Sequence, residues 1–78
     1  MDYDRFRIEN PEYMHCIEIP RGQNNLTTIA SCAKILNQMS LKMFRNYKTT
    51  STSTHNVYWF KDYEHATAFQ EKATIHVK

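Results

Sequence analysis

Four histidines and two cysteines are the side chains in this sequence that could hold a metal ion or act as nucleophiles. Zinc sites and Cys/His catalytic pairs require such residues to be closely spaced or to share one face of an element. His15 and Cys16 are adjacent in a predicted strand, so their side chains point to opposite faces. Cys16 and Cys32 are too few for a disulfide framework and too widely spaced for a zinc knuckle. We therefore expect free, buried thiols and no catalytic residue, metal or cofactor.

Aromatic and basic residues in the middle of the chain indicate binding chemistry instead. The segment between Ile19 and Lys61 contains six bases and no acid, whereas five of the eight acids lie in residues 1–18. This asymmetry indicates a polyanionic or acidic partner. Aromatic rings among lysines suit base stacking with phosphate contact, and equally a protein interface with an aromatic anchor. The predicted binding residues are Trp59, Phe44, Lys42, Lys48, Arg45 and Lys61.

Alternation along two predicted strands places the aromatic members of this set on one sheet face. If Tyr58 and Phe60 point at the helices, Trp59 points at the opposite, open face. On the neighbouring strand, the same face carries Phe44 between two lysines. Exposed large aromatic rings on a flat sheet are costly for a monomer. We therefore expect a partner, a second subunit or the N-terminal segment of the chain itself to cover this face.

The periodicity of apolar residues switches between strand and helix along the chain. Alternation with period two predicts strands, and apolar residues three and four apart predict helices. Asn10-Pro11 and the pair Pro20 and Gly22 are typical of turns, and the Ser/Thr run at 49–54 is interpreted as a solvated loop. The predicted elements are strands at 13–19, 41–48, 56–60 and 74–77, helices at 24–38 and 63–72, and a short edge strand at 4–9.

This order of elements predicts an α+β fold of the ferredoxin-like, split βαβ type. That fold has a four-stranded antiparallel sheet with two helices on one face, to which the N-terminal segment adds an edge strand. Residues 1–78 then form a single domain, with 1–12 as an N-terminal extension or edge strand. The predicted core consists of Ile17, Ile19, Ile29, Ala33, Leu36, Met43, Tyr58, Phe60, Ala66 and Phe69.

The segment from Val57 to Phe69 resembles the third strand and second helix of an RNA recognition motif. An aromatic strand end, the acidic cap Asp62 and an alanine four residues later carry this resemblance, which covers 13 of the 78 residues. It implies an open sheet that stacks the bases of single-stranded RNA, although His55 and Val57 stand where that family has its stacking rings. The segment is also similar to small tailed-phage proteins in which an aromatic strand leads through Phe-Lys-Asp into a short helix. That similarity implies a phage-encoded accessory or inhibitory protein.

Length and composition limit the function classes. A chain of 78 residues with a mean hydropathy of −0.69 forms one small domain. It contains no apolar run that approaches the roughly 18 residues of a membrane span. The net charge of +2 argues against a nucleic-acid mimic, and the acidic start is unlike a signal peptide. We therefore expect a cytoplasmic protein, located in the host cytoplasm if it is phage-encoded.

These observations predict a small non-enzymatic binding protein that docks on a host macromolecule through its open sheet face and basic middle segment. The expected partner is a host protein or ribonucleoprotein. A single-stranded RNA- or DNA-binding module is the alternative function, and a small nuclease on the same fold is the second alternative. A homodimer through the open sheet face is a further interpretation of the same aromatic surface.

Overall fold

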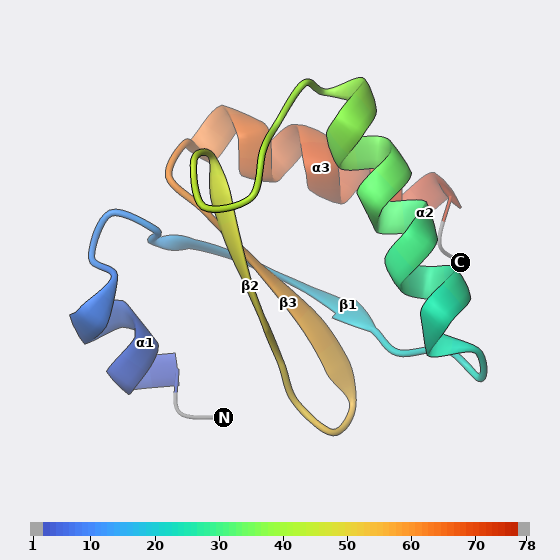
Figure 1. The fold of residues 1–78 in the computed structure, drawn as a ribbon, viewed down its shortest axis with the longest axis horizontal. Helices are drawn as coiled ribbons and strands as arrows, with labels where there is room; N and C mark the ends of the chain where they lie inside the picture. The colour runs from blue at the N-terminus through green and yellow to red at the C-terminus, as the bar shows by residue number, and fades with distance from the viewer. Residues whose placement is uncertain (1–2, 77–78) are drawn as a thin grey trace.

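The fold is built on a three-stranded antiparallel sheet with the strand order β1-β3-β2 (Figure 1). The computed structural model describes residues 3–76, with side chains described for residues 3–73. Three helices accompany the three strands in this part of the chain. In chain order the elements are α1 (Tyr3–Glu9), β1 (His15–Pro20), α2 (Asn25–Gln38), β2 (Tyr47–Ser51), β3 (His55–Phe60) and α3 (Tyr63–His76).

The prediction of a four-stranded ferredoxin-like sheet with two helices is wrong at both ends of the chain. Residues 74–76, predicted to begin a fourth strand, continue helix α3, and residue 77 lies outside the described residues. The helix is favoured because Ala66, Phe69 and Ala73 recur at helical spacing and are all buried in the core. The segment at 4–9, predicted to be an edge strand, forms helix α1 instead.

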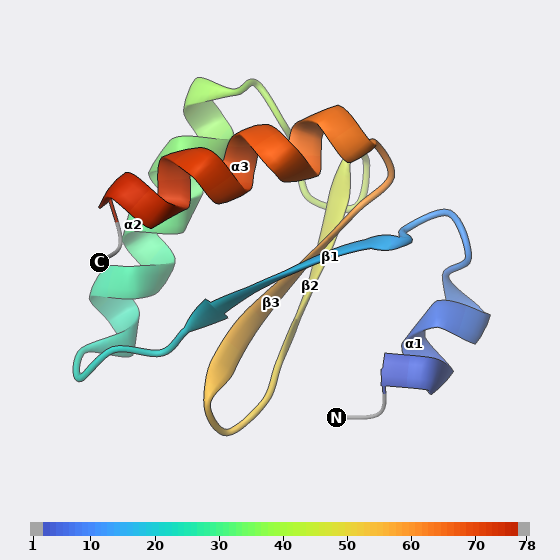
Figure 2. The ribbon, with the colours of Figure 1, turned by 180° about the vertical axis from the view of Figure 1, so that it is seen from behind.

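The helices lie on both sides of the sheet. Helices α2 and α3 pack together on one face, where they form the larger core with residues of all three strands. Helix α1 lies on the opposite side of the strands, as Figures 1 and 2 show. A sheet that was expected to have one open face is therefore covered on both faces, at least around its central strand. None of the helices in the described residues has the length and apolar character needed to cross a membrane.

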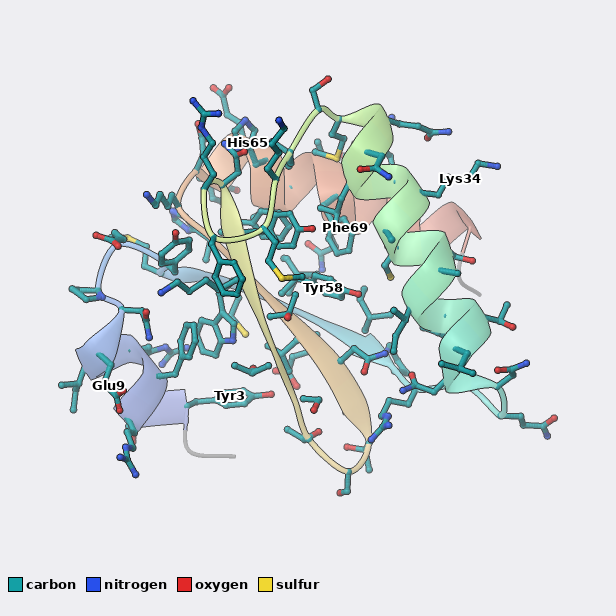
Figure 3. The ribbon with its side chains drawn as sticks, viewed as in Figure 1. Tyr3, Glu9, Lys34, Tyr58, His65 and Phe69 are labelled. Carbon is teal, nitrogen blue, oxygen red and sulfur yellow. The ribbon has the colours of Figure 1, made fainter. Side chains whose placement is uncertain are left out.

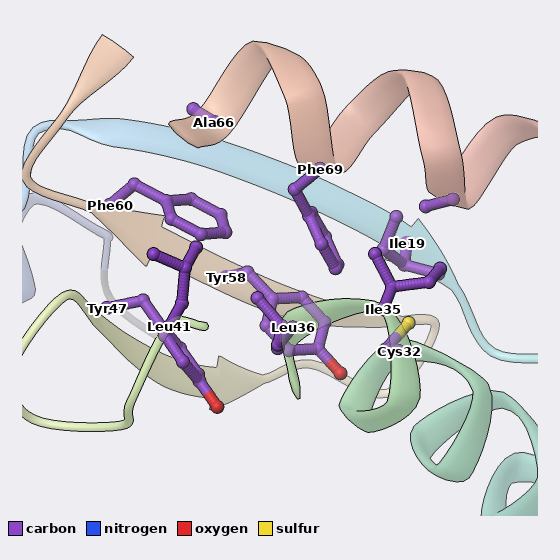
Figure 4. Packing of buried hydrophobic residues seen from close by; sticks show 11 residues of the cluster. Ile19, Cys32, Ile35, Leu36, Leu41, Tyr47, Tyr58, Phe60, Ala66 and Phe69 are labelled. Atoms are coloured by element: carbon purple, nitrogen blue, oxygen red, sulfur yellow. The ribbon is translucent and has the colours of Figure 1, made fainter. Parts of the chain in front are cut away.

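Strand β3 is the central strand and supplies side chains to both faces. Tyr58 and Phe60 point into the larger core, and Val57 and Trp59 point into a smaller cluster beneath α1. This alternation confirms the sequence-based assignment of the two faces. In the larger core, the ring of Phe69 lies 4.8 Å from that of Tyr58 and 5.3 Å from that of Phe60, measured between centroids (Figure 4).

Helix α2 is rotated relative to its predicted phase. Its N-terminus is capped by Asn24, whose side chain accepts a hydrogen bond from the Thr27 amide at 3.3 Å. The buried positions of this helix are Thr28, Cys32, Ile35 and Leu36. Of the predicted core, Ile29, Ala33 and Met43 are exposed and Ile17 is half-buried, whereas the remaining six residues are buried. Buried residues outside the predicted core are Tyr13, Cys32, Ile35, Leu41, Tyr47, Val57, Trp59 and Ala73, of which the Cys32 thiol was separately expected to be buried.

The hairpin formed by β2 and β3 is shifted relative to its prediction. The segment predicted as a strand at 41–48 is mostly irregular or turn up to Tyr47, with positive φ angles of 60° at Ser40, just before it, and 66° at Phe44. Strand β2 begins at Tyr47 and takes in Thr49, Thr50 and Ser51, which were predicted to belong to a loop. Threonine is itself a favourable strand residue, so a Ser/Thr run can serve as an edge strand.

Candidate interaction surface around Phe44

Trp59 is fully buried, so the prediction that it shares an exposed sheet face with Phe44 is wrong. Its exposed fraction is 0%, because α1 covers the face of the sheet to which it points. Cover by the N-terminal segment was one of the alternatives that the sequence left open. The open face that a homodimer would use is therefore occupied by the chain's own first helix.

Helix α1 holds Trp59 through aromatic and cationic contacts. The Phe6 ring stacks on the indole with centroids 4.5 Å apart, and the Tyr3 ring meets it edge-on at 5.3 Å. Figure 3 shows Tyr3 pointing from α1 toward the strands. The Arg7 guanidinium lies 5.6 Å from the indole centroid on the same helix. The indole Nε1 donates to Thr50 Oγ1 at 2.9 Å, which satisfies its one polar group.

Phe44 has the opposite environment, because its side chain is 71% exposed. Its φ angle of 66° lies in the left-handed region, which a bulky residue seldom adopts. Two hydrogen bonds hold the backbone there: the Phe44 amide donates to the Tyr47 carbonyl at 2.7 Å, and the Phe44 carbonyl accepts from the Tyr13 hydroxyl at 3.0 Å. The structure therefore fixes the backbone of Phe44 while it leaves the ring in solvent.

The turn that carries Phe44 is closed by its own side-chain and backbone groups. The Lys42 amide donates to Asn46 Oδ1, and the Asn46 amide donates to the Lys42 carbonyl, both at 2.9 Å. The Arg45 amide donates to the same carbonyl at 3.2 Å. Lys42 and Arg45, which precede and follow Phe44 in the sequence, are both exposed. The turn thus presents one aromatic and two basic side chains on a hydrogen-bonded frame.

Two further lysines join this turn through Tyr13. The ammonium groups of Lys48 and Lys61 lie 5.0 Å and 5.1 Å from the centroid of the Tyr13 ring, at cation–π distance. Lys48 also donates to Asn10 Oδ1 at 2.6 Å, and the Lys61 amide donates to the Asn46 carbonyl at 3.3 Å. We call the set Lys42, Phe44, Arg45, Lys48 and Lys61 the Phe44 surface. The structure places Lys48 and Lys61 on the Tyr13 ring and joins the Tyr13 hydroxyl to the turn that carries Phe44, and it leaves Trp59 beneath α1.

The cations of the Phe44 surface form no ion pair with acids of the described part of the chain. The ion pair found there joins Arg5 Nε to Glu9 Oε1 at 2.8 Å on the exposed side of α1, and no member of the Phe44 surface takes part in one. Lys48 and Lys61 are instead stabilised by neutral partners. The surface therefore carries four cations that have no ion-pair partner in the described residues, around an exposed ring.

The potentially reactive side chains are arranged for packing. In the described residues, no group of three His, Cys, Asp or Glu side chains is placed to hold a metal ion. Both cysteines are free, and Cys32 is buried while Cys16 is half-buried. Burial raises the pKa of both thiols, and the nearby Glu18 carboxylate raises that of Cys16 further. A raised pKa lowers the thiolate fraction and hence the nucleophilicity of both thiols.

Tyr13, which contacts members of the Phe44 surface, is the residue at this site that sequence reasoning missed. It was placed in a strand, but it precedes β1, and its ring is 2% exposed. Its position after the turn at Asn10-Pro11, within the acidic segment 1–18, gave no signal that its ring would contact two lysines. Only the tertiary fold brings Tyr13 to the Phe44 carbonyl, 31 positions along the chain.

Comparison with known proteins adds no relative on which to base a function. No protein-family model, no curated protein and no solved structure matches this chain.

Proposed function

We propose that this chain is a small non-enzymatic binding protein that docks on an acidic macromolecular surface through the Phe44 surface. The observation that supports this most is the exposed ring of Phe44, held by two backbone hydrogen bonds in a left-handed conformation. Such conformations cost about 1–3 kcal/mol and cluster at functional sites. The surrounding cations give the proposal its chemistry, because they lack acidic partners among the described residues.

An acidic protein is the partner that this arrangement favours. Protein interfaces concentrate binding energy in a few aromatic and arginine anchors, with charged residues at the rim that steer association. Phe44 with Arg45 and its neighbouring lysines has this composition. A partner that carries Asp and Glu around an apolar pocket would complement it.

Single-stranded nucleic acid is the second candidate. It is favoured by the four cations, which could contact phosphates while Phe44 stacks on a base. The burial of Trp59 weakens this candidate, since one exposed ring on this surface remains of the two that the sequence predicted. A nucleic-acid complex would lose affinity by about 0.7 log units per log of salt for each single-strand phosphate contact.

The proposal is tested by placing a photoreactive group at the site. Phe44 is replaced by p-benzoylphenylalanine, and the protein is irradiated in a nuclease-treated lysate of the cells in which it occurs. We expect a cross-linked acidic protein. The matched control carries the same group at Tyr63, whose side chain is 67% exposed.

Unmodified protein should compete for the cross-link, whereas a Phe44→Ala competitor should fail and a Tyr63→Ala competitor should succeed. Cross-linking of equal extent from both positions, or equal competition by both variants, would contradict the proposal. A cross-linked product that forms in untreated lysate and is absent from the nuclease-treated lysate would favour the nucleic-acid candidate instead.

A further inference from the structure

A groove lies between α2 and strand β2, on the helix side of the sheet. Its volume is about 370 Å³, at the lower end of the size of ligand pockets. The floor is apolar and includes Leu36, Tyr47 and Tyr58, and the rim is formed by Ile29 and Met43, which are 42% and 45% exposed. Leu26 extends this apolar strip along α2, one helical turn before Ile29. Among the described residues, no acidic side chain lines the groove.

One wall of this groove is a strand edge that has no neighbour in the described residues. Strand β2 is the last in the order β1-β3-β2, and in Figure 1 it lies at the outer side of β3. Met43 forms a parallel bridge with Tyr47, so the turn before β2 covers only the first residue of this edge. The edge from Thr49 to Ser51 is left uncovered.

The backbone groups of Thr49 and Ser51 point away from the sheet. In an antiparallel pair, successive residues direct their N–H and C=O groups alternately toward and away from the partner strand. The Thr52 amide donates to the His55 carbonyl at 2.9 Å, so the backbone N–H and C=O groups of Thr52 and Thr50 face β3. The Tyr47 carbonyl accepts from Phe44 outside the hairpin, which agrees with this alternation. Thr49 and Ser51 therefore offer two donors and two acceptors to an added strand.

Arg21 stands at the Ser51 end of the groove. Its Nη1 donates to the Thr52 carbonyl at 3.0 Å. The Asn25 amide oxygen, in the orientation that satisfies both groups, accepts from Arg21 Nη2 at 2.8 Å and from Nε at 3.1 Å. These neutral acceptors fix the guanidinium, and no ion pair in the described residues involves it. An arginine so held can still bind a carboxylate with its remaining N–H groups.

We propose that the edge of β2 and this groove bind an extended acidic peptide segment of a partner protein, which adds to the sheet as an antiparallel strand. In this arrangement the peptide residue opposite Ser51 has a carboxylate side chain that contacts the Arg21 guanidinium. The peptide residue two positions later lies opposite Thr49 and places an apolar side chain in the groove. Main-chain hydrogen bonds to Thr49 and Ser51 supply affinity, and the two side chains supply specificity. The site is distinct from the Phe44 surface and does not depend on the function proposed for it.

The charge and polarity of the groove select this occupant. The apolar lining requires an apolar side chain, and the fixed guanidinium without an acid requires an anion beside it. The free donors and acceptors of the edge require a partner backbone in extended form. An antiparallel direction agrees with both existing strand pairs. It also places the N-terminal end of the peptide at Ser51, next to Arg21.

The test uses the peptide Asp-Thr-Leu-Thr-Leu, acetylated and carrying fluorescein at its C-terminus. Binding to the full chain is followed by fluorescence anisotropy. Arg21→Gln should weaken binding by about tenfold or more, since it removes a charge-assisted contact. Lys34→Gln is the matched control, because it makes the same charge change on the outer side of α2 (Figure 3). Thr49→Pro should abolish binding, because it removes an outward donor without breaking the pairing of β2 with β3.

Two N-methylated peptides test the pairing geometry. In the proposed antiparallel arrangement the amide of the first leucine, opposite Thr49, faces β2, so methylation of that nitrogen should abolish binding and methylation of the first threonine nitrogen should preserve it. Absence of binding up to millimolar peptide, or equal affinities for the two methylated peptides, would overturn the proposal. So would a dimer in sedimentation that Thr49→Pro converts to monomer, because a second copy of the chain would then be the occupant.

Discussion

Thr50 is the acceptor that allows the indole of Trp59 to be buried. Thr50→Val removes the acceptor and leaves the indole N–H unpaired in the small cluster beneath α1. An unsatisfied buried donor costs about 1–3 kcal/mol. We therefore expect the free energy of unfolding in urea to fall by that amount. Thr49→Val, on the exposed neighbouring residue, should change it by no more than about 0.5 kcal/mol. Equal effects of the two substitutions would contradict this role of Thr50.

Tyr58 makes the free energy of unfolding depend on pH in the alkaline range. Burial raises the pKa of its phenol above the ordinary value of 10.0, and the neighbouring Cys32 raises it further. The folded state therefore keeps a proton that the unfolded state releases. This contribution is fully present below about pH 10 and is lost as the pH rises above it.

Urea denaturation at pH 7 and at pH 10.5 should accordingly show a smaller loss of stability in Tyr58→Phe than in the parent protein. Part of the loss should persist in the variant, because burial also raises the pKa of Tyr47 and Cys32. Tyr63→Phe, at an exposed tyrosine, should lose as much as the parent. A variant at Tyr58 with an unchanged pH dependence would show that this phenol does not contribute.

Residue patterns predicted the direction of side chains better than their exposure. The alternation of Val57, Tyr58, Trp59 and Phe60 gave both faces of β3 correctly, because strand geometry is local. Whether the second face meets solvent depends on a helix 50 residues away in sequence, which no local pattern reveals. Of the six predicted binding residues, the five of the Phe44 surface therefore cluster at one end of the sheet and Trp59 does not.

At the scale of elements, α1 depends on its contacts with the sheet. It has seven residues, too few for an isolated helix to be stable in water. Phe6→Ala removes the ring that stacks on Trp59 and should speed amide hydrogen exchange in α1, with little change in β3. Ile8→Ala, at a residue that is 80% exposed, is the control and should leave exchange in α1 nearly unchanged. Faster exchange throughout the sheet of the Phe6 variant would mean that α1 and the sheet unfold as one unit.

Elements with strong internal periodicity were predicted closely. The helix predicted at 24–38 is α2 at Asn25–Gln38, and the strand predicted at 56–60 is β3 at His55–Phe60. The short N-terminal segment at 4–9 was predicted wrongly. The head alternates charged and apolar residues over only six positions, and such a stretch also forms one and a half turns of helix with Phe6 on its inner side.

At the scale of the whole molecule, packing in the larger core supplies a large part of the free energy of unfolding. Phe69 is fully buried between α3 and the sheet, and Phe69→Ala should cost about 3–5 kcal/mol. Domains of this kind have about 5–15 kcal/mol in total, so the variant should be partly unfolded at ambient temperature by circular dichroism. Lys72→Ala, on the exposed side of the same helix, should melt like the parent. If Phe69→Ala also melted like the parent, the main stabilising contacts would have to lie elsewhere.

The overall class was predictable, whereas the strand number was not. The chain is a small single-domain α+β protein, as the alternating periodicities indicated. The order β1-β3-β2 is set by the central aromatic strand, which pairs on both sides. A fourth strand did not form from residues 74–76 because Ala73, buried at 2% exposure, extends the apolar side of α3. Tertiary burial thus decided between two local structures that the sequence allowed.

The packing of α1 on Trp59 gives this protein an optical reporter of its own. The chain has a single tryptophan, and its indole is enclosed by Phe6, Tyr3 and Arg7 of that helix. Any event that lifts the helix from the sheet brings water to the indole and shifts its emission to longer wavelength. The emission maximum of Trp59 therefore reports the position of the N-terminal helix without an added label. Ligands that bind at the Phe44 surface or in the groove should leave the indole enclosed and the emission maximum unchanged.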